Sequence, residues 1–277
     1  MSKKVKKKSS KKSDVYVKVK KIDLDKLDKK KNKKLKTIIM FIIFILCLFG
    51  LAYSSAKIYN WNKNLNENED IQEDLSDKVK EEVDDTGNPV FYVDFNALKE
   101  LNNDTVAYLD YKQFNISYVV VKGKDNDYYL NHNFSKKSNE AGWIFADYRN
   151  NFDGTDKNIV LFGHSMKNGS MFGSLHKILN DKNYQKEENQ VMTFVTPEGT
   201  YKYKLFSVYT IDAEDYYITT VFKNKKEWKT FIKKMKSRSI YNFNVNVSEK
   251  DTIITLSTCQ GYTGNKRLVV QAVRIKE

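Results

Sequence analysis

Hydrophobic and polar positions divide the chain into four segments, each with its own pattern. Residues 1–36 are rich in lysine and have few apolar positions and no clear period, which is typical of a disordered tail. Residues 37–56 contain no charged side chain. Residues 57–89 mix acidic positions with regularly spaced apolar ones, and residues 90–277 alternate short apolar runs with polar loops. The pattern predicts a basic tail, a transmembrane helix, an acidic helical stalk and one folded domain, in that order.

The uncharged segment, TIIMFIIFILCLFGLAYSSA, has the length that a membrane span requires. At ~1.5 Å per residue it forms a helix of about 30 Å, which matches the hydrocarbon core of a bilayer. A cleaved signal peptide is the alternative, but the apolar stretch is long and no clean small-residue cleavage site stands out. Lysines crowd the N-terminal flank and only Lys57 marks the other, so the positive-inside rule predicts a cytoplasmic N-terminus and an extracellular C-terminal domain.

The net charge of the chain resides in its N-terminal tail. The whole chain has a formal charge of +13, and residues 1–36 hold 17 lysines against four aspartates, which is the same net charge. The remainder is therefore neutral overall. A basic protein often binds nucleic acid, but a charge confined to one tail favours a role in membrane topology and contact with anionic lipid.

The segment 57–89 is predicted to be a helical stalk. Between residues 62 and 85 there are ten acidic and three basic side chains. Ile71, Leu75, Val79 and Val83 recur every four residues, which favours an amphipathic helix, and Gly87-Asn88-Pro89 ends the pattern.

Strand-like runs dominate residues 90–277, and this length is enough for one domain with a real core. Runs rich in Val, Ile, Tyr, Phe and Thr are 105–109, 116–121, 143–146, 158–162, 191–195, 201–211, 252–257 and 268–275. Two segments are predicted helices, 94–101 and 223–238, and the apolar positions of the second indicate packing. Many short strands with few helices favour a mostly antiparallel barrel or sandwich.

Cys259 is the residue that points most directly to chemistry. The only other cysteine, Cys47, lies in the predicted membrane span, so Cys259 has no intrachain disulfide partner in the predicted extracellular domain. A thiol with a pKa of about 8.5 is mostly protonated at neutral pH and becomes a strong nucleophile beside a base or a cation. We therefore interpret Cys259 as a catalytic nucleophile, and a packed core thiol in an anchored binding protein is the non-enzymatic alternative.

His164 and Arg267 are the candidate partners of the thiol. His164 follows the run 158–162 and Gly163, whereas His132 and His176 lie in a polar loop and on a helical turn. Arg267 comes eight residues after Cys259, at the start of the next run, where a guanidinium could stabilise an oxyanion. Spacing alone leaves two other readings open, a surface loop histidine and an arginine in a surface ion pair.

These residues resemble the class B sortases, a family of membrane-anchored cysteine transpeptidases of Gram-positive bacteria. The resemblance covers about residues 90–277. It rests on Thr255-Leu-Ser-Thr-Cys259, Gly163-His164, Arg267, the segments Asp125-Asn-Asp-Tyr-Tyr-Leu130 and Asp147-Tyr-Arg-Asn150, and a helix inserted before the cysteine strand. It implies a closed eight-stranded β-barrel with a short N-terminal helix. The domains are then a cytoplasmic tail (1–36), a transmembrane helix (37–56), a stalk (57–89) and a catalytic domain (90–277).

The resemblance also implies a reaction. Cys259 would attack the Thr carbonyl of a C-terminal sorting motif on a secreted protein and form a thioester, and an amine of the cell-wall peptide, carried on a lipid-linked precursor, would resolve it. His164 would protonate the leaving amine and then activate the incoming one, and Arg267 would stabilise the oxyanion or position the substrate. Ser257, Thr258, Tyr217, Ile218 and Asn126 match positions that bind the sorting peptide. Phe162 stands where some class B members have Tyr, which leaves the motif preference open.

Other functions are weighed against this one. An L,D-transpeptidase would place His-Gly directly before the cysteine, where this chain has Ser257-Thr258, and papain-like peptidases run cysteine before histidine. A sortase that polymerises pilins onto a lysine is an alternative within the family. The sequence predicts no metal or cofactor, because it has neither a ligand cluster at metal spacing nor a glycine-rich phosphate loop. The exact motif, acceptor, clients and oligomeric state do not follow from the sequence.

Overall fold

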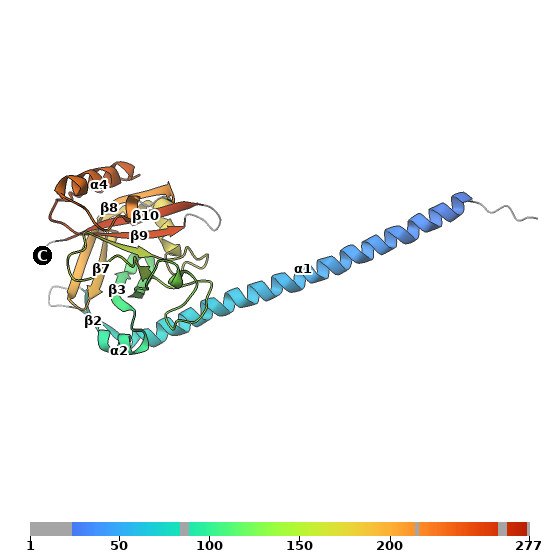
Figure 1. Ribbon diagram of the computed structural model, residues 1–277, viewed down its shortest axis with the longest axis horizontal. Helices are drawn as coiled ribbons and strands as arrows, with labels where there is room; N and C mark the ends of the chain where they lie inside the picture. The colour runs from blue at the N-terminus through green and yellow to red at the C-terminus, as the bar shows by residue number, and fades with distance from the viewer. Residues whose placement is uncertain (1–23, 84–88, 214–215, 260–264, 276–277) are drawn as a thin grey trace, which may run out of the picture. The chain divides into compact units, whose positions relative to one another are not determined.

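The protein is described by a computed structural model that covers residues 24–83, 89–213, 216–259 and 265–275 (Figure 1). The chain divides into two compact units between Lys57 and Ile58, and each is described by itself.

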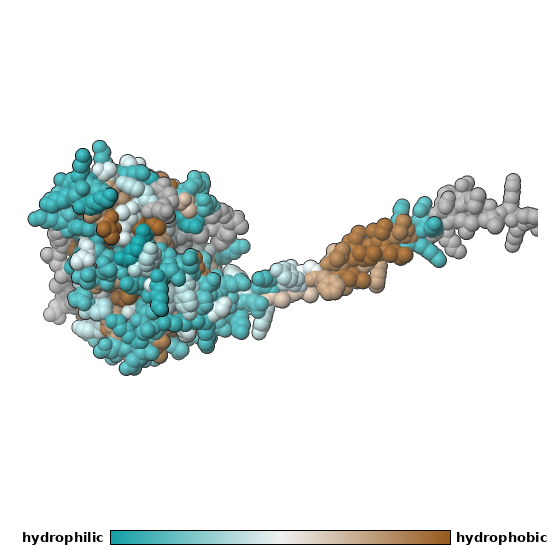
Figure 2. Space-filling view, viewed as in Figure 1, coloured by the Kyte–Doolittle hydropathy of each residue, from teal (hydrophilic) through white to brown (hydrophobic). Residues whose placement is uncertain are grey.

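The first unit contains the N-terminal part of helix α1 (Leu24–Ser76). In the described residues this is the one helix that is long and apolar enough to cross a membrane. Its large hydrophobic side chains between Leu35 and Leu51 are exposed, and the apolar part of the helix is brown in Figure 2. The helix therefore fits a single-pass membrane anchor.

The second unit is built on a closed barrel of eight strands, as predicted. Their order around the barrel is β10-β8-β7-β3-β4-β5-β6-β9. The strands are β3 (Thr105–Tyr111), β4 (Ile116–Val121), β5 (Phe145–Ala146), β6 (Asn158–Phe162), β7 (Val191–Thr196), β8 (Gly199–Asp212), β9 (Ile253–Cys259) and β10 (Lys266–Arg274). The barrel is mixed, because β4 pairs with β5 and β6 pairs with β9 in parallel. The other six pairs are antiparallel.

Side chains that alternate along the strands fill two separate cores. In β9, Ile254 and Leu256 belong to the cluster that fills the barrel, whereas Ile253 belongs to a second cluster beneath helix α4 (Lys225–Arg238). Trp228, Phe231, Ile232 and Met235 are the buried face of α4, which confirms that these positions pack. A helix thus covers part of the outer barrel wall, and β9 and β10 are apolar on both faces there because both faces are buried.

Short helices fill the connections between the strands. Helix α2 (Phe95–Leu101) begins at Asp94, whose carboxylate accepts the N–H of Ala97, and helix α3 (Lys177–Asn180) is a single turn. The 3₁₀ turns are η1 (Lys112–Phe114), η2 (Tyr128–Leu130), η3 (Gly173–His176), η4 (Lys182–Gln185), η5 (Glu187–Asn189) and η6 (Tyr216–Ile218).

The predicted helix through Val83 is wrong beyond Ser76. Val79–Val83 forms strand β1, which pairs antiparallel with β2 (Pro89–Val93). Apolar residues four apart fit one face of a strand as well as one face of a helix, so the spacing of Val79 and Val83 does not separate the two.

The end of α1 also packs against the barrel. Leu75 is 2% exposed, and the Asn68 side chain donates to the Gly142 carbonyl at 3.0 Å. Residues 58–83 therefore belong to the same compact unit as the barrel. The Gly87-Asn88 part of the predicted turn lies outside the described residues.

Candidate active site

Three adjacent strands bring the candidate catalytic positions to one end of the barrel wall. Strand β9 lies between β6 and β10. Cys259 is the last residue of β9 and stands opposite Arg267 in the antiparallel pairing with β10. The two positions are neighbours because the chain reverses direction between the strands, as the sequence predicts.

His164 reaches the same end from the other side of β9. The parallel ladder pairs Phe162 with Ser257, and the Gly163 N–H donates to the Ser257 carbonyl at 3.3 Å. His164 and Cys259 each follow this last pair by two residues, so both lie at the same end of the ladder. Glycine is required at 163, because a Cβ there would lie 2.8 Å from Cδ2 of Phe172.

The imidazole of His164 is held in a defined orientation. Its Nε2 lies 2.6 Å from the Leu130 carbonyl oxygen. A carbonyl only accepts hydrogen bonds, so Nε2 carries a proton and Nδ1 is the nitrogen left for proton exchange.

The carbonyl that holds His164 is itself anchored in the core. Leu130 ends η2, and the preceding Tyr129 is buried, donating from its hydroxyl to the Asp104 carboxylate at 2.7 Å and accepting from the Asn102 amide at 3.0 Å. Burial raises the pKa of Tyr129, so this hydroxyl keeps its proton at any physiological pH. The Tyr129 hydroxyl therefore stays a hydrogen-bond donor to Asp104.

Arg267 is half-buried, and its guanidinium donates to the Lys266 carbonyl at 3.3 Å. Within the described residues it forms no ion pair with a carboxylate, so the surface ion pair left open by the sequence is not found there. Its remaining N–H donors can therefore bind a negatively charged oxygen of a substrate.

Ser257 and Tyr217 form a buried pair beside this end of β9. Each is 3% exposed, and the two hydroxyl oxygens lie 3.0 Å apart. Ser257 precedes Cys259 by two residues along β9. Thr258 has the opposite parity, shared with Leu256; it is 2% exposed, and its hydroxyl has no hydrogen-bond partner in the described part of the chain.

Two polar side chains, one of them fully buried, fasten the η6 segment to the barrel. The Asn158 amide donates to the carbonyls of Tyr217 (3.3 Å) and Thr219 (3.0 Å), and its Oδ1 accepts from the Thr255 hydroxyl (2.7 Å). The Arg149 guanidinium donates to the Ile218 carbonyl at 2.9 Å. Tyr217 and Ile218 thus lie on a segment that is held at three successive carbonyls.

Asn126 joins the same network from a different loop. Its amide donates to the Asp147 carboxylate at 3.0 Å and accepts the Tyr148 N–H at 3.1 Å. Asp147 in turn binds Arg149 through two hydrogen bonds of 2.7 and 2.6 Å. A charged contact through two hydrogen bonds holds both side chains in a fixed geometry. The hydrogen bonds of Asn126, Asp147 and Arg149 thus connect the loop of Asn126, the loop that contains Asp147 and Arg149, and η6.

Sequence reasoning did not single out Asn158 or Arg149 as residues that shape this site. Arg149 lies in a segment already noted for the resemblance, and an asparagine inside an apolar run is a signal that a buried polar group has a partner. The other two histidines have different surroundings. His132 stacks on Tyr128 with ring centroids 4.0 Å apart, and His176 hydrogen-bonds Ser165 at 2.9 Å. The described residues contain no cluster of side chains suited to a metal ion.

Comparisons with known proteins agree on one class. The sortase domain matches residues 109–275, more than half of the chain, and the chain therefore belongs to the sortase family of cysteine transpeptidases. The sortase B of Listeria monocytogenes is 41% identical over 162 residues, which are 58% of this chain and 65% of that protein, just under two thirds.

Two further relatives confirm the resemblance to class B. The sortase B of Staphylococcus aureus is 35% identical over 184 residues, 66% of this chain and 75% of that protein. Its structure in a substrate complex covers 80% of this chain and 98% of its own, with 30% identity and a TM-score of 0.62. The Bacillus anthracis sortase B in complex with AAEK1 has a TM-score of 0.67 at 33% identity, covering 78% of this chain and 99% of its own.

Proposed function

We propose that this sortase cleaves a C-terminal sorting motif of secreted proteins after Thr, forms a thioester on Cys259 and transfers the protein to an amine of the cell-wall peptide. The observation that carries the proposal is the strand register, which brings His164, Cys259 and Arg267 to the same end of β6, β9 and β10. The substrate complex of the S. aureus relative supports a peptide as the substrate class.

His164 serves as the acid and base of the reaction. In the first half, the Cys259 thiolate attacks the Thr carbonyl, and His164 gives a proton to the leaving amine. In the second half, the same nitrogen takes a proton from the incoming amine, which attacks the thioester and releases the thiolate. Nδ1 is the nitrogen for both transfers, because Nε2 is bound to the Leu130 carbonyl.

Arg267 stabilises the negative charge that forms on the carbonyl oxygen during both steps. Within the described residues this guanidinium has no carboxylate partner, so no ion pair has to be broken when it binds the substrate.

The sorting peptide binds along the wall that η6 forms over β9. Tyr217 and Ile218 supply the apolar and aromatic surface of this wall, and Ser257 lines its base through the bond to Tyr217. Thr258 supports the strand from the inner face, and Asn126 fixes the loop at the far side through Asp147. The position of Phe162 two residues before His164 makes the floor of the groove apolar.

The N-terminal helix anchors the enzyme as a single-pass membrane protein, with the lysine-rich tail in the cytoplasm and the barrel outside. No ATP is available there to drive peptide-bond formation. A thioester retains enough free energy for the transfer, and amines attack thioesters readily. The acceptor is the free amine of the cell-wall peptide on a lipid-linked precursor.

A peptide assay on the full chain in neutral detergent tests the proposal. A library of peptides with internal Thr-Gly and Thr-Asn bonds is incubated with and without a short amine-bearing peptide, and the products are identified by mass spectrometry. We expect cleavage after Thr in both cases and a ligated product only with the amine. Cys259→Ala abolishes both products, whereas the matched variant Cys47→Ala retains them. Cleavage at another bond, or turnover by Cys259→Ala near the parent level, contradicts the proposal.

A further inference from the structure

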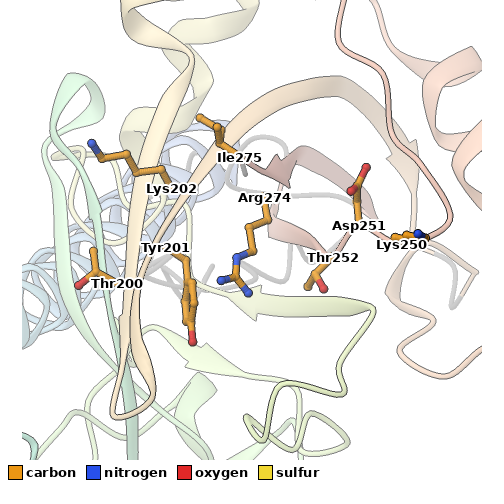
Figure 3. A pocket seen from close by; sticks show the side chains of 8 residues that line it. All are labelled: Thr200, Tyr201, Lys202, Lys250, Asp251, Thr252, Arg274 and Ile275. Carbon is orange, nitrogen blue, oxygen red and sulfur yellow. The ribbon is translucent and has the colours of Figure 1, made fainter. Parts of the chain in front are cut away.

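A cavity lies at the end of β9 and β10 away from Cys259 and Arg267. It has a volume of about 470 Å³ and is lined by residues 200–202, 250–252, 274 and 275, as Figure 3 shows. Thr252 precedes β9 and Cys259 ends it, and seven residues of extended strand at ~3.3 Å each separate the two places by roughly 23 Å. The cavity is therefore distinct from the proposed catalytic site.

The walls of this cavity are fixed by the barrel itself. The Arg274 N–H donates to the Thr252 carbonyl at 2.9 Å, and the Ile275 N–H donates to the Lys202 carbonyl at 2.8 Å. Main-chain hydrogen bonds thus join the three segments that line the cavity. The backbone of the cavity is therefore in place before any ligand arrives, which lowers the entropy lost on binding.

Arg274 is the central cation of the cavity. Its guanidinium carbon lies 3.8 Å from the centre of the Tyr201 ring, and Figure 3 shows the group between Tyr201 and Thr252. A guanidinium stacked on a ring keeps its in-plane N–H donors free at the edge. Within the described ranges, Arg274 forms no ion pair.

The rest of the lining adds positive charge and hydroxyl groups. Lys202 and Lys250 contribute two more cations, and neither forms an ion pair in the part of the chain that the structure describes. Asp251 contributes the only carboxylate of the lining. Its Oδ2 accepts the Ser248 N–H at 2.7 Å, and in Figure 3 the carboxylate points away from the Arg274 guanidinium.

A smaller cavity shares Tyr201, Thr252 and Arg274 with this one and is lined also by Asp156 and Glu198. The Asp156 carboxylate is occupied, because it accepts the N–H groups of Asn151 and Phe152 at 3.0 and 2.8 Å. Arg274 therefore lines both cavities, one together with Asp156 and Glu198 and the other together with Lys202 and Lys250.

We propose that the cavity around Arg274 binds a phosphoryl group. In Figure 3 the Arg274 guanidinium and the Thr252 side chain lie next to each other, and Lys250 lies on the same segment as Thr252, whereas Thr200 and Lys202 point away from the guanidinium. A guanidinium with a hydroxyl and an ammonium group nearby suits the oxygen atoms of a phosphoryl group. The volume leaves room for the organic part of a phosphodiester. Two sources share this chemistry, a phosphodiester polymer and a phospholipid headgroup. The site binds its ligand and does not take part in acyl transfer.

Arginine-selective NMR on the full chain in neutral detergent micelles tests this directly. The chain has only four arginines, at 149, 238, 267 and 274, and its lysine-rich tail has none. Phosphate that binds the tail therefore leaves the arginine side-chain signals unchanged. With ¹⁵N label at arginine Nε, we expect inorganic phosphate to shift the Arg274 signal to saturation and to leave Arg149 and Arg267 in place. Arg274→Lys assigns the signal.

Variants separate a built site from a general effect of charge. Lys250→Gln and Thr252→Val are expected to weaken phosphate binding by about tenfold at the Arg274 signal, which is close to the loss of one good hydrogen bond. Lys99→Gln, an exposed lysine on α2, is the matched control and leaves the binding curve unchanged. The Arg149 and Arg238 signals report in each variant that the fold is intact.

The source of the phosphoryl group is decided with two further probes. A poly(glycerol phosphate) oligomer that saturates the Arg274 signal below the concentration needed for inorganic phosphate assigns a polymer. The second probe compares nanodiscs that contain phosphatidylglycerol with nanodiscs of phosphatidylcholine. A shift of the Arg274 signal with the first kind of nanodisc and not with the second assigns a lipid headgroup. The proposal is overturned if Arg274 does not respond to any probe, if all four arginine signals move together, or if Lys99→Gln weakens binding as much as Lys250→Gln.

Discussion

Strand β10 carries an arginine at each end, and the two ends differ in what surrounds the guanidinium. Arg267 stands opposite Cys259, with His164 across β9. Arg274 stacks on Tyr201 beside a cationic cavity with no cysteine or histidine in its lining. Neither forms an ion pair within the described residues. An unpaired arginine alone therefore does not define a reaction; a nucleophile and a proton carrier beside it do.

The largest expected effect concerns the proton carrier that only one end possesses. His164→Ala should lower turnover of a sorting peptide by about 10²–10⁴-fold, because the leaving amine then departs without a proton. His132→Ala is the matched control and should stay within about twofold, since His132 stacks on Tyr128 in a surface loop. Steady-state kinetics on both variants measure this, and a larger loss in His132→Ala would reverse the assignment.

The two arginines are then compared directly in the same assay. Arg267→Ala should reduce kcat/KM by about 10²-fold or more, as expected when a donor to an oxyanion is removed. Arg274→Ala should leave kcat/KM within about twofold, since its site lies a strand length away. Equal losses in the two variants would remove the distinction between the ends of β10.

A smaller effect is expected from the residue that fastens η6 to the barrel. Asn158→Ala leaves the carbonyls of Tyr217 and Thr219 without their donor, which should cost about 1–3 kcal/mol of stability and raise KM more than it lowers kcat. Thr255→Val is the control, because it removes the hydroxyl that bonds Asn158 and Gln271 but leaves both carbonyls bound. Thermal unfolding and kinetics measured together separate the two. If Thr255→Val raises KM equally, the effect arises from general destabilisation.

The sequence predicts the strands of this barrel well because their apolar runs are local. The runs 116–121 and 158–162 coincide with β4 and β6, and the helix 223–238 overlaps α4. The failure at β1 has a physical cause, since Val79 and Val83 occupy one face in either a helix or a strand. Only the pairing with β2 decides between them, and pairing is a tertiary contact.

The candidate site shows the same division between local and tertiary information. The unpaired cysteine and the resemblance to class B sortases are enough to identify Cys259, His164 and Arg267 as candidates, because both depend on residue types in the sequence. The η6 tether escaped notice because Asn158 meets Tyr217 across 59 residues of chain, which no spacing rule connects. Arg274 likewise reads as the end of an apolar run, and its stacking on Tyr201 depends on β8 and β10 being neighbours.

The central claim is that Cys259 carries the acyl group, and one measurement tests it most directly. The full chain is mixed with the peptide library, quenched in acid within a turnover, digested and mapped by mass spectrometry. We predict that a peptide ending in Thr is attached to Cys259 and that neutral hydroxylamine removes it. At long times with the amine in excess, this adduct should be absent. An adduct on any other residue, or rapid cleavage without an adduct on Cys259 under conditions where the amine is absent, would contradict it.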